Sequence, residues 1–188
     1  YLAAIQAGGC AAPLTTSAAP RQLAAMMVDS GASHLFIDTA KRAELAESGV
    51  TLPPVTIVML DTADGDAPAL ADWMAEEGAR PEPVSPHVGD PFNIIYSSGT
   101  TGTPKGIVHA HLMRWRQAAG GFKSIYAPDS RTLCSTPLYS NTTFAVFLPT
   151  MLWGGAAYIM GKFDAERWLE IAEAEHITHT MLVPVQYQ

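Results

Sequence analysis

The stretch from Phe92 to Gly106, FNIIYSSGTTGTPKG, decides the fold, because a short apolar run leads directly into a loop of glycine, serine and threonine. The run Phe92–Tyr96 is typical of a buried strand. The three glycines that follow let the backbone turn through conformations closed to other residues, and they bring its N–H groups close to a ligand. The helical spacing of Leu112, Trp115 and Ala119 predicts a helix over 109–125. The loop would then open onto the amino end of a helix, which favours negative charge.

The side chains of this loop suit a polyphosphate. Such a ligand needs several oriented donors and one cation, and packing gains nothing from so polar a run. The loop does not have the spacing of a Walker A motif, because Pro104 precedes Lys105. An ordinary exposed loop is the alternative. It does not account for eleven consecutive residues of this composition, Tyr96–Gly106. The candidate phosphate-binding residues are Ser97, Ser98, Gly99, Thr100, Thr101, Gly102, Thr103 and Lys105.

Outward from the loop, strand-like and helix-like segments alternate along the chain. Strands are predicted over 34–37, 55–60, 92–96, 131–136, 156–160 and 180–183, and helices over 1–7, 17–30, 41–47, 70–77, 109–125, 142–153 and 164–175. Ser17 and Asp164 are the expected helix caps, and the acidic, Pro- and Gly-rich segment 61–91 is expected to be largely surface connection. This alternation predicts an α/β fold with a largely parallel sheet covered by helices on both faces. Active sites in such sheets lie beyond the carboxyl ends of the strands.

Composition limits the class of protein. The 188 residues are 48% hydrophobic and carry 11 basic and 18 acidic side chains, a net charge of −7, which argues against a nucleic-acid or anionic-membrane binder. The stretch between Asp90 and Asp129 contains no acidic residue, and it holds Lys105, Arg114, Arg116 and Lys123. These cations either receive a small anionic ligand or lie solvated on a helix face.

Cysteine usage and the chain ends suggest a location and a length. Cys10 and Cys134 are far apart in apolar surroundings, as expected of buried thiols in a reducing compartment. No apolar run is long enough to span a membrane, and a cytoplasmic protein is expected. The chain begins with Tyr1 and ends at Gln188 just after an apolar strand, so we expect a fragment of a longer protein.

The run Tyr96–Gly106 resembles the Ser/Thr/Gly-rich signature of the adenylate-forming superfamily, which includes acyl-CoA synthetases, peptide-synthetase adenylation domains and beetle luciferases. The resemblance extends over nearly the whole chain. It includes Tyr1–Pro13, Lys105–His111, Pro137-Leu138-Tyr139, Phe163-Asp164 and Val183–Tyr187. It implies that residues 1–188 are the phosphate-loop part of the large N-terminal domain of an acid–CoA ligase, with the C-terminal domain absent. The adenine-site and ribose-binding motifs of the family are not found, so the isolated fragment is expected to be inactive.

The resemblance also implies a reaction and its participants. A small carboxylic acid, fatty or aryl, would attack ATP in the presence of Mg²⁺ to give an acyl-adenylate, and coenzyme A would then displace AMP. Thr100, Thr101 and Lys105 would stabilise the pyrophosphate as it leaves. Where the family commonly has His after Pro-Leu-aromatic, this chain has Ser140, so Tyr139 and Ser140 are the candidates for the acid pocket. Tyr139 as a core aromatic is the alternative.

Other functions remain open at this point. An adenylation domain that loads a carrier protein shares the first half of the reaction, and a non-catalytic nucleotide-binding module shares only the loop. A metal site is not expected, because His109 and His111 are two positions apart on the predicted helix and point in different directions, with no Cys or acid nearby.

Overall fold

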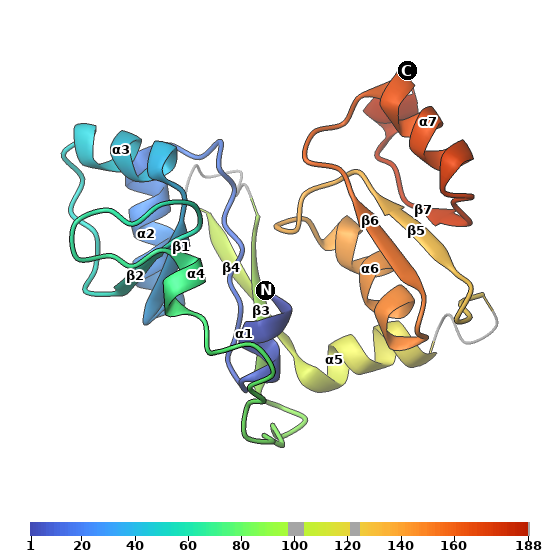
Figure 1. Cartoon of the computed structure of the whole chain (residues 1–188), viewed down its shortest axis with the longest axis horizontal. Coiled ribbons are helices and arrows are strands. Elements are labelled where there is room, and N and C mark those ends of the chain that lie inside the picture. Colours follow the sequence, from blue (N-terminus) through green and yellow to red (C-terminus); the bar gives the residue numbers. More distant parts are fainter. Residues whose placement is uncertain (98–103, 121–124, 188) are drawn as a thin grey trace. The chain divides into compact units, whose positions relative to one another are not determined.

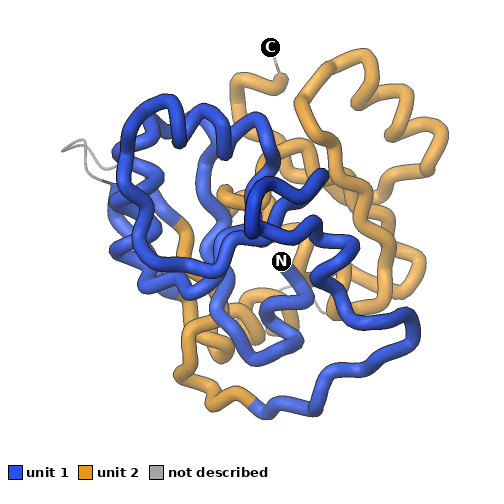
Figure 2. The backbone as a smooth tube through the Cα atoms, turned by 60° about the vertical axis from the view of Figure 1, so that its left-hand side comes forward, with its two compact units in different colours: residues 1–85, 96–108 blue, residues 86–95, 109–188 orange. Residues whose placement is uncertain are grey.

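A computed structural model of the chain describes residues 1–97, 104–120 and 125–187. The chain forms two compact units, one made of residues 1–85 with 96–108 and the other of residues 86–95 with 109–188 (Figure 2). Each unit has its own parallel strands and helices (Figure 1). The α/β class predicted from the sequence is therefore confirmed.

The first unit contains a parallel pair of strands. Its elements are α1 (Leu2–Gln6), α2 (Pro20–Ser30), β1 (His34–Ile37), α3 (Thr39–Glu47), β2 (Thr56–Met59) and α4 (Leu70–Trp73). The register of the pair places Ile37 opposite Met59. Both side chains are buried in one apolar cluster with Leu23 of α2 and Leu45 of α3.

Helices contact both faces of this strand pair. Successive side chains of a strand point to opposite faces, so Phe36 faces away from the cluster that contains Ile37. Its ring meets Trp73 of α4 edge-on, with the ring centroids 5.4 Å apart. Helices were predicted to cover both faces of the sheet, and at β1 they do, with α2 and α3 on one face and α4 on the other.

The second unit contains a three-stranded parallel sheet. Its elements are α5 (His111–Trp115), a π-helix (Arg116–Gly120), β5 (Arg131–Cys134), α6 (Asn141–Leu152), β6 (Ala156–Ile159), α7 (Ala165–Ala174), β7 (His179–Thr180) and a 3-10 helix (Pro184–Tyr187). The strand order is β6-β5-β7. Helix α6 packs on β5 and β6, and it buries Phe144 and Phe147. Central strand β5 ends at Cys134, five residues before Tyr139, the first residue predicted to border the acid.

A further pair of strands flanks the Ser/Thr/Gly loop. Strand β3 (Pro91–Ser97) precedes the loop, and β4 (Lys105–Ala110) follows it and pairs with β3. The sequence predicted a helix from His109 onward, but the β-branched pair Ile107-Val108 lies in β4, and a helix begins only at His111. Consequently the expected opening of the loop onto a helix amino end is wrong.

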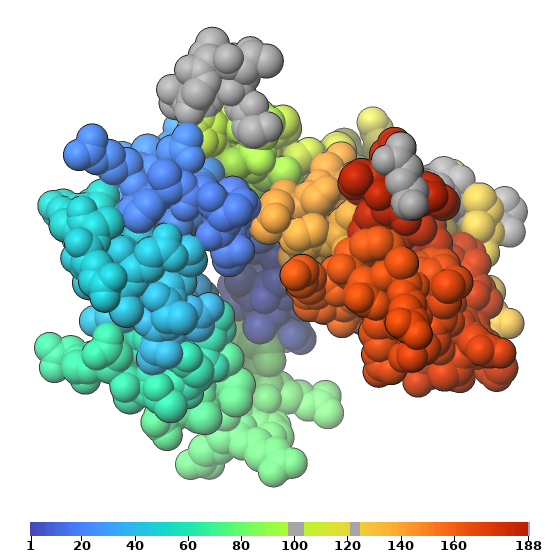
Figure 3. All heavy atoms as spheres, turned by 90° about the horizontal axis from the view of Figure 1, so that it is seen from above, coloured from blue at the N-terminus to red at the C-terminus, as the bar shows by residue number. Residues whose placement is uncertain are grey.

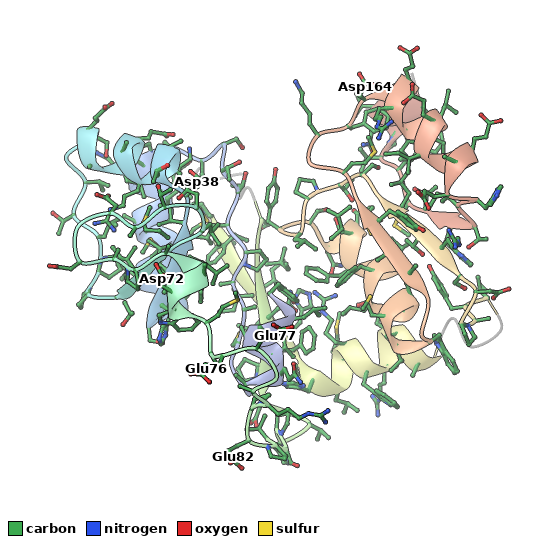
Figure 4. The ribbon with its side chains drawn as sticks, viewed as in Figure 1. Asp38, Asp72, Glu76, Glu77, Glu82 and Asp164 are labelled. Atoms are coloured by element: carbon green, nitrogen blue, oxygen red, sulfur yellow. The ribbon has the colours of Figure 1, made fainter. Side chains whose placement is uncertain are left out.

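Of the two predicted helix caps, Asp164 is observed and Ser17 is not, and Asp38 is a further cap that the sequence analysis did not predict. The carboxylates of Asp38 and Asp164 accept hydrogen bonds from the N–H groups of Lys41, at 2.7 Å, and Arg167, at 2.8 Å, so each aspartate caps its helix (Figure 4). The prediction that Ser17 caps α2 is wrong. That helix begins at Pro20, with Ala19 at the cap position, because proline is well suited to the first helical turn.

The acidic segment 61–91 is mostly exposed connection, as predicted. Its helix α4 ends at Trp73, earlier than the expected Glu77. Glu76, Glu77 and Glu82 are exposed on the chain that follows, which extends from one edge of the first unit (Figures 3 and 4).

The two cysteines differ in their surroundings. Cys134 is buried, as expected, and burial raises the pKa of its thiol to about 11. Cys10 is exposed, so the expectation of a buried Cys10 is wrong. Its apolar neighbours in sequence do not form a buried strand, since 9–18 is largely irregular chain.

Candidate functional site

The strand before the loop is fastened to α2 through Tyr96. The Tyr96 hydroxyl lies 2.7 Å from Asp29 Oδ2 and 3.0 Å from the carbonyl oxygen of Met26, as donor to both. Burial raises the pKa of this hydroxyl, and the hydrogen bond to Asp29 and its negative charge raise it further. Tyr96 is therefore neutral at physiological pH and holds the end of β3 in place.

The described part of the loop comprises its two ends. Ser97 is the last residue of β3 and is exposed, and Lys105 is the first residue of β4 and is also exposed. The six remaining candidates, Ser98, Gly99, Thr100, Thr101, Gly102 and Thr103, lie outside the described residues. An exposed ammonium and hydroxyl at the two ends of a donor-rich loop are suited to an anionic ligand.

The candidate acid-binding residues lie beyond the carboxyl end of β5, in the second unit. Tyr139 and Ser140 are both half-buried in the turn between β5 and α6. The Ser140 hydroxyl accepts a hydrogen bond from the N–H of Thr142 at 3.3 Å and so caps α6. Ser140 thus has a structural role, and its hydroxyl is engaged by the helix it begins.

The turn is held by a buried threonine that sequence reasoning did not single out. Thr143 Oγ1 lies 2.6 Å from the carbonyl oxygen of Pro137 and 2.8 Å from that of Thr136, and it also lies 2.8 Å from Thr136 Oγ1. The side chain is 1% exposed. The signal available in the sequence was a pair of threonines, Thr142 and Thr143, in the first turn of a mostly apolar helix.

A second contact joins the end of the chain to the same region. Gln186 Nε2 donates, at 3.4 Å, to both the carbonyl oxygen and the hydroxyl of Ser135. Its amide oxygen accepts from the N–H of Val183 at 3.0 Å. The segment 183–187, singled out by its sequence motif, therefore lies beside the carboxyl end of β5.

The two histidines considered for a metal are in different elements. His109 is buried in β4, and His111 begins α5, with its ring edge-on to Phe92 at 5.2 Å. Within residues 1–97, 104–120 and 125–187, no three His, Cys, Asp or Glu side chains gather into a possible metal site.

Among the helices that the structure describes, none has the length and apolar character needed to cross a membrane.

Comparison with known proteins places the chain in one family. A family model described as AMP-binding enzyme matches residues 1–188. The feruloyl-CoA synthase of an Amycolatopsis species is 33% identical over 187 residues, which cover 97% of this chain and 35% of that protein. D-lysergyl-peptide-synthetase subunit 2 of Epichloe festucae var. lolii is 28% identical, over 97% of this chain and 13% of that protein. The chain thus spans about a third of the first relative and less of the second.

A solved structure with the same fold is that of ATP-bound MatB from Rhodopseudomonas palustris. It superposes with a TM-score of 0.77 at 25% identity, over all of this chain and 37% of that one.

Proposed function

Because the chain belongs to the family of AMP-binding enzymes, which is the adenylate-forming superfamily that its loop resembles, we propose that it is the phosphate-binding part of an AMP-forming acid–CoA ligase. The observation that carries the proposal is the Ser/Thr/Gly loop that joins β3 to β4, with Lys105 exposed at its end. In this proposal residues 1–188 are a portion of the large N-terminal domain and are inactive by themselves. The share of its relatives that the chain spans supports this assignment.

The proposed reaction has two steps. A carboxylate oxygen of the acid attacks the α-phosphorus of ATP, the bond between the α-phosphorus and the bridging oxygen breaks, and pyrophosphate leaves. The thiolate of coenzyme A then attacks the acyl carbon, and AMP leaves as the acyl–oxygen bond breaks. The products are the thioester, AMP and pyrophosphate.

The loop residues would act in the first step. Negative charge accumulates on the departing pyrophosphate, and fixed N–H and hydroxyl donors stabilise it without having to reorient. We assign the hydroxyl contacts to Thr100 and Thr101, the surrounding contacts to Ser97, Ser98, Gly99, Gly102 and Thr103, and the cationic contact to Lys105. Mg²⁺ bound with ATP would neutralise further charge on the phosphates.

The acid is assigned to the region beyond the carboxyl end of β5. Tyr139 would line the pocket, and Ser140 would support the wall as the cap of α6. We propose a fatty or aryl acid, and the similarity to a feruloyl-CoA synthase gives aryl acids priority in a test. A cytoplasmic location completes the proposal, since the reaction consumes ATP and coenzyme A.

Loading of a carrier protein is the second candidate, and the similarity to a peptide synthetase favours it. It shares the adenylation step and differs in the acceptor, which is a carrier-bound thiol in place of coenzyme A.

The test is acid-dependent exchange of labelled pyrophosphate into ATP by the full-length protein. Aryl, medium-chain and long-chain acids are screened with Mg²⁺ and with the metal chelated by EDTA. We expect exchange with one acid class, and loss of exchange in EDTA. Thioester formation with coenzyme A or with a carrier protein then separates the two candidates. A folded full-length protein that shows no exchange with any acid would instead support a non-catalytic nucleotide-binding module.

A further inference from the structure

A buried guanidinium joins three segments of the second unit. Arg114 of α5 is only 2% exposed. Its Nε donates to Asn93 Oδ1 at 2.9 Å, and its Nη1 donates to Gln117 Oε1 at 2.7 Å and to Asn141 Oδ1 at 2.8 Å. The ring of Phe144 lies 5.0 Å from the guanidinium carbon. Three amide oxygens and a phenyl ring thus surround this cation.

This environment rules out one sequence-based interpretation. A solvated cation on a helix face would be exposed, and Arg114 is not. A buried charge is costly unless it is hydrogen-bonded, and a planar guanidinium reaches several acceptors at fixed angles, which an ammonium does not. The arrangement therefore requires arginine, and it fixes the three acceptors relative to one another.

Two of the three acceptors belong to segments that adjoin the proposed binding residues, one to the strand before the phosphate loop and one to the helix after the proposed acid-binding turn. Asn93 is fully buried in β3, four residues before Ser97 at the start of the loop. Asn141 is the first residue of α6 and directly follows Tyr139 and Ser140. Gln117 lies only three residues from Arg114 and so ties the arginine to its own segment.

We infer that Arg114 is a positioning residue for adenylation, which fixes the acid-side turn Tyr139–Asn141 against the strand that leads into the phosphate loop. This inference rests on the proposed function. Attack on the α-phosphorus requires the carboxylate within near-attack distance and in line with the leaving group, and a misplacement of about 1 Å can reduce the rate about 100-fold. A rigid link at Asn141 limits such displacement.

The test compares single-residue changes in the full-length protein. Asn141→Ala removes the link to the acid side. Alanine is a better helix former than asparagine and Asn141 is exposed, so α6 itself is retained. Asn141→Asp keeps an acceptor for Arg114. Gln117→Ala is the matched control, because it removes a hydrogen bond of similar length that does not reach the acid side.

Three quantities are measured for each variant: kcat and KM in acid-dependent pyrophosphate exchange, the thermal midpoint, and backbone hydrogen exchange in the turn and first residues of α6. We expect Asn141→Ala to lower kcat about ten-fold, with the KM for ATP within about two-fold of the wild type, and to speed hydrogen exchange at 139–143. Asn141→Asp should retain most of kcat. Gln117→Ala should lower the thermal midpoint comparably, with a smaller loss of kcat.

Equal losses of kcat in Asn141→Ala and Gln117→Ala, in proportion to their loss of stability, would show that Arg114 is structural only and would overturn the inference. The same holds if hydrogen exchange at 139–143 is unchanged in Asn141→Ala. Absence of exchange activity in the wild-type protein is a different result, which overturns the proposed function and, with it, the positioning role.

Discussion

The hydroxyl of Tyr96 and the carboxylate of Asp29 are 2.7 Å apart, and this contact fastens the last residues of β3 to α2. Asp29 is separated from Tyr96 by 67 positions in the sequence. The bond therefore closes a long loop of chain immediately before the residues assigned to phosphate.

Tyr96→Phe should reduce the free energy of unfolding by about 0.5–1.5 kcal/mol at neutral pH, the net value of one hydrogen bond. The pKa of Tyr96 is raised in the folded protein by burial and by Asp29. A hydroxyl whose pKa is higher in the folded than in the unfolded protein stabilises the fold. This stabilisation is complete below the pKa of the unfolded state, near 10, and it declines as the pH rises further. The difference in free energy of unfolding between the wild type and Tyr96→Phe should thus become smaller above about pH 10.

The measurement is urea unfolding at a series of pH values. Tyr187→Phe, which removes the hydroxyl of a residue 72% exposed, is the control and should follow the wild type throughout. If the free energy of unfolding of Tyr96→Phe differs from that of the wild type by the same amount up to pH 11, the hydrogen bond between Tyr96 and Asp29 is contradicted.

Lys105→Ala should slow acid-dependent pyrophosphate exchange about 100-fold, the lower end of the range for losing one donor to a developing negative charge. Lys105 is exposed, so the thermal midpoint should be unchanged. Lys162→Ala is the control, since it removes the same charge from another exposed position, and its rate should equal that of the wild type. An unchanged rate in Lys105→Ala would remove this lysine from the mechanism.

Local signals in the sequence predicted most of the elements. Strand β5 and helix α7 with its cap Asp164 lie where apolar periodicity and capping chemistry placed them. The exception was 105–110. No strand was predicted there, and the helix predicted from His109 overlapped the last two residues of β4, because the pairing of β4 with β3 is a contact that local spacing does not reveal.

The loop could be identified from the sequence because its chemistry is concentrated in consecutive residues. The environment of Arg114 could not. Its partners Asn93 and Asn141 are 21 and 27 positions away, and each alone is an ordinary polar residue. Only the fold brings these three side chains together.

Thr143→Val should alter the acid side of the site selectively. Valine keeps the shape of threonine, but it leaves the carbonyl oxygens of Thr136 and Pro137 without the hydroxyl that lies beside them. We expect a loss of about 1–2 kcal/mol in stability. The turn that contains Tyr139 should loosen, so the KM for the acid should rise several-fold while the KM for ATP stays constant.

Thr150→Val provides the comparison for steady-state kinetics with both substrates. Thr150 is buried in the same helix, and its hydroxyl bonds to Thr132 and to the carbonyl oxygen of Val146. A similar loss of stability without a change in KM is expected. If both variants raise the KM for the acid equally, the turn is not specifically held by Thr143.

Gly155→Ala should destabilise the second unit through a steric conflict. A Cβ atom at this position would lie 2.5 Å from the carbonyl oxygen of Ser130 and 3.0 Å from Thr150 Cγ2. Ser130 cannot withdraw easily, because the same carbonyl oxygen accepts a hydrogen bond from the N–H of Ala156 at 2.8 Å, where β6 begins beside β5. Overpacking of this kind costs about 1–3 kcal/mol, which thermal unfolding detects as a lower midpoint.

Gly161→Ala is the matched control for this measurement. Gly161 also lacks a positive φ, and no atom lies within 4 Å of the Cβ that would be added. Its midpoint should equal that of the wild type or rise slightly, because alanine reduces the conformational entropy of the unfolded chain. Equal midpoints for the two alanine variants would mean that β6 does not approach Ser130 as closely as the backbone hydrogen bond requires.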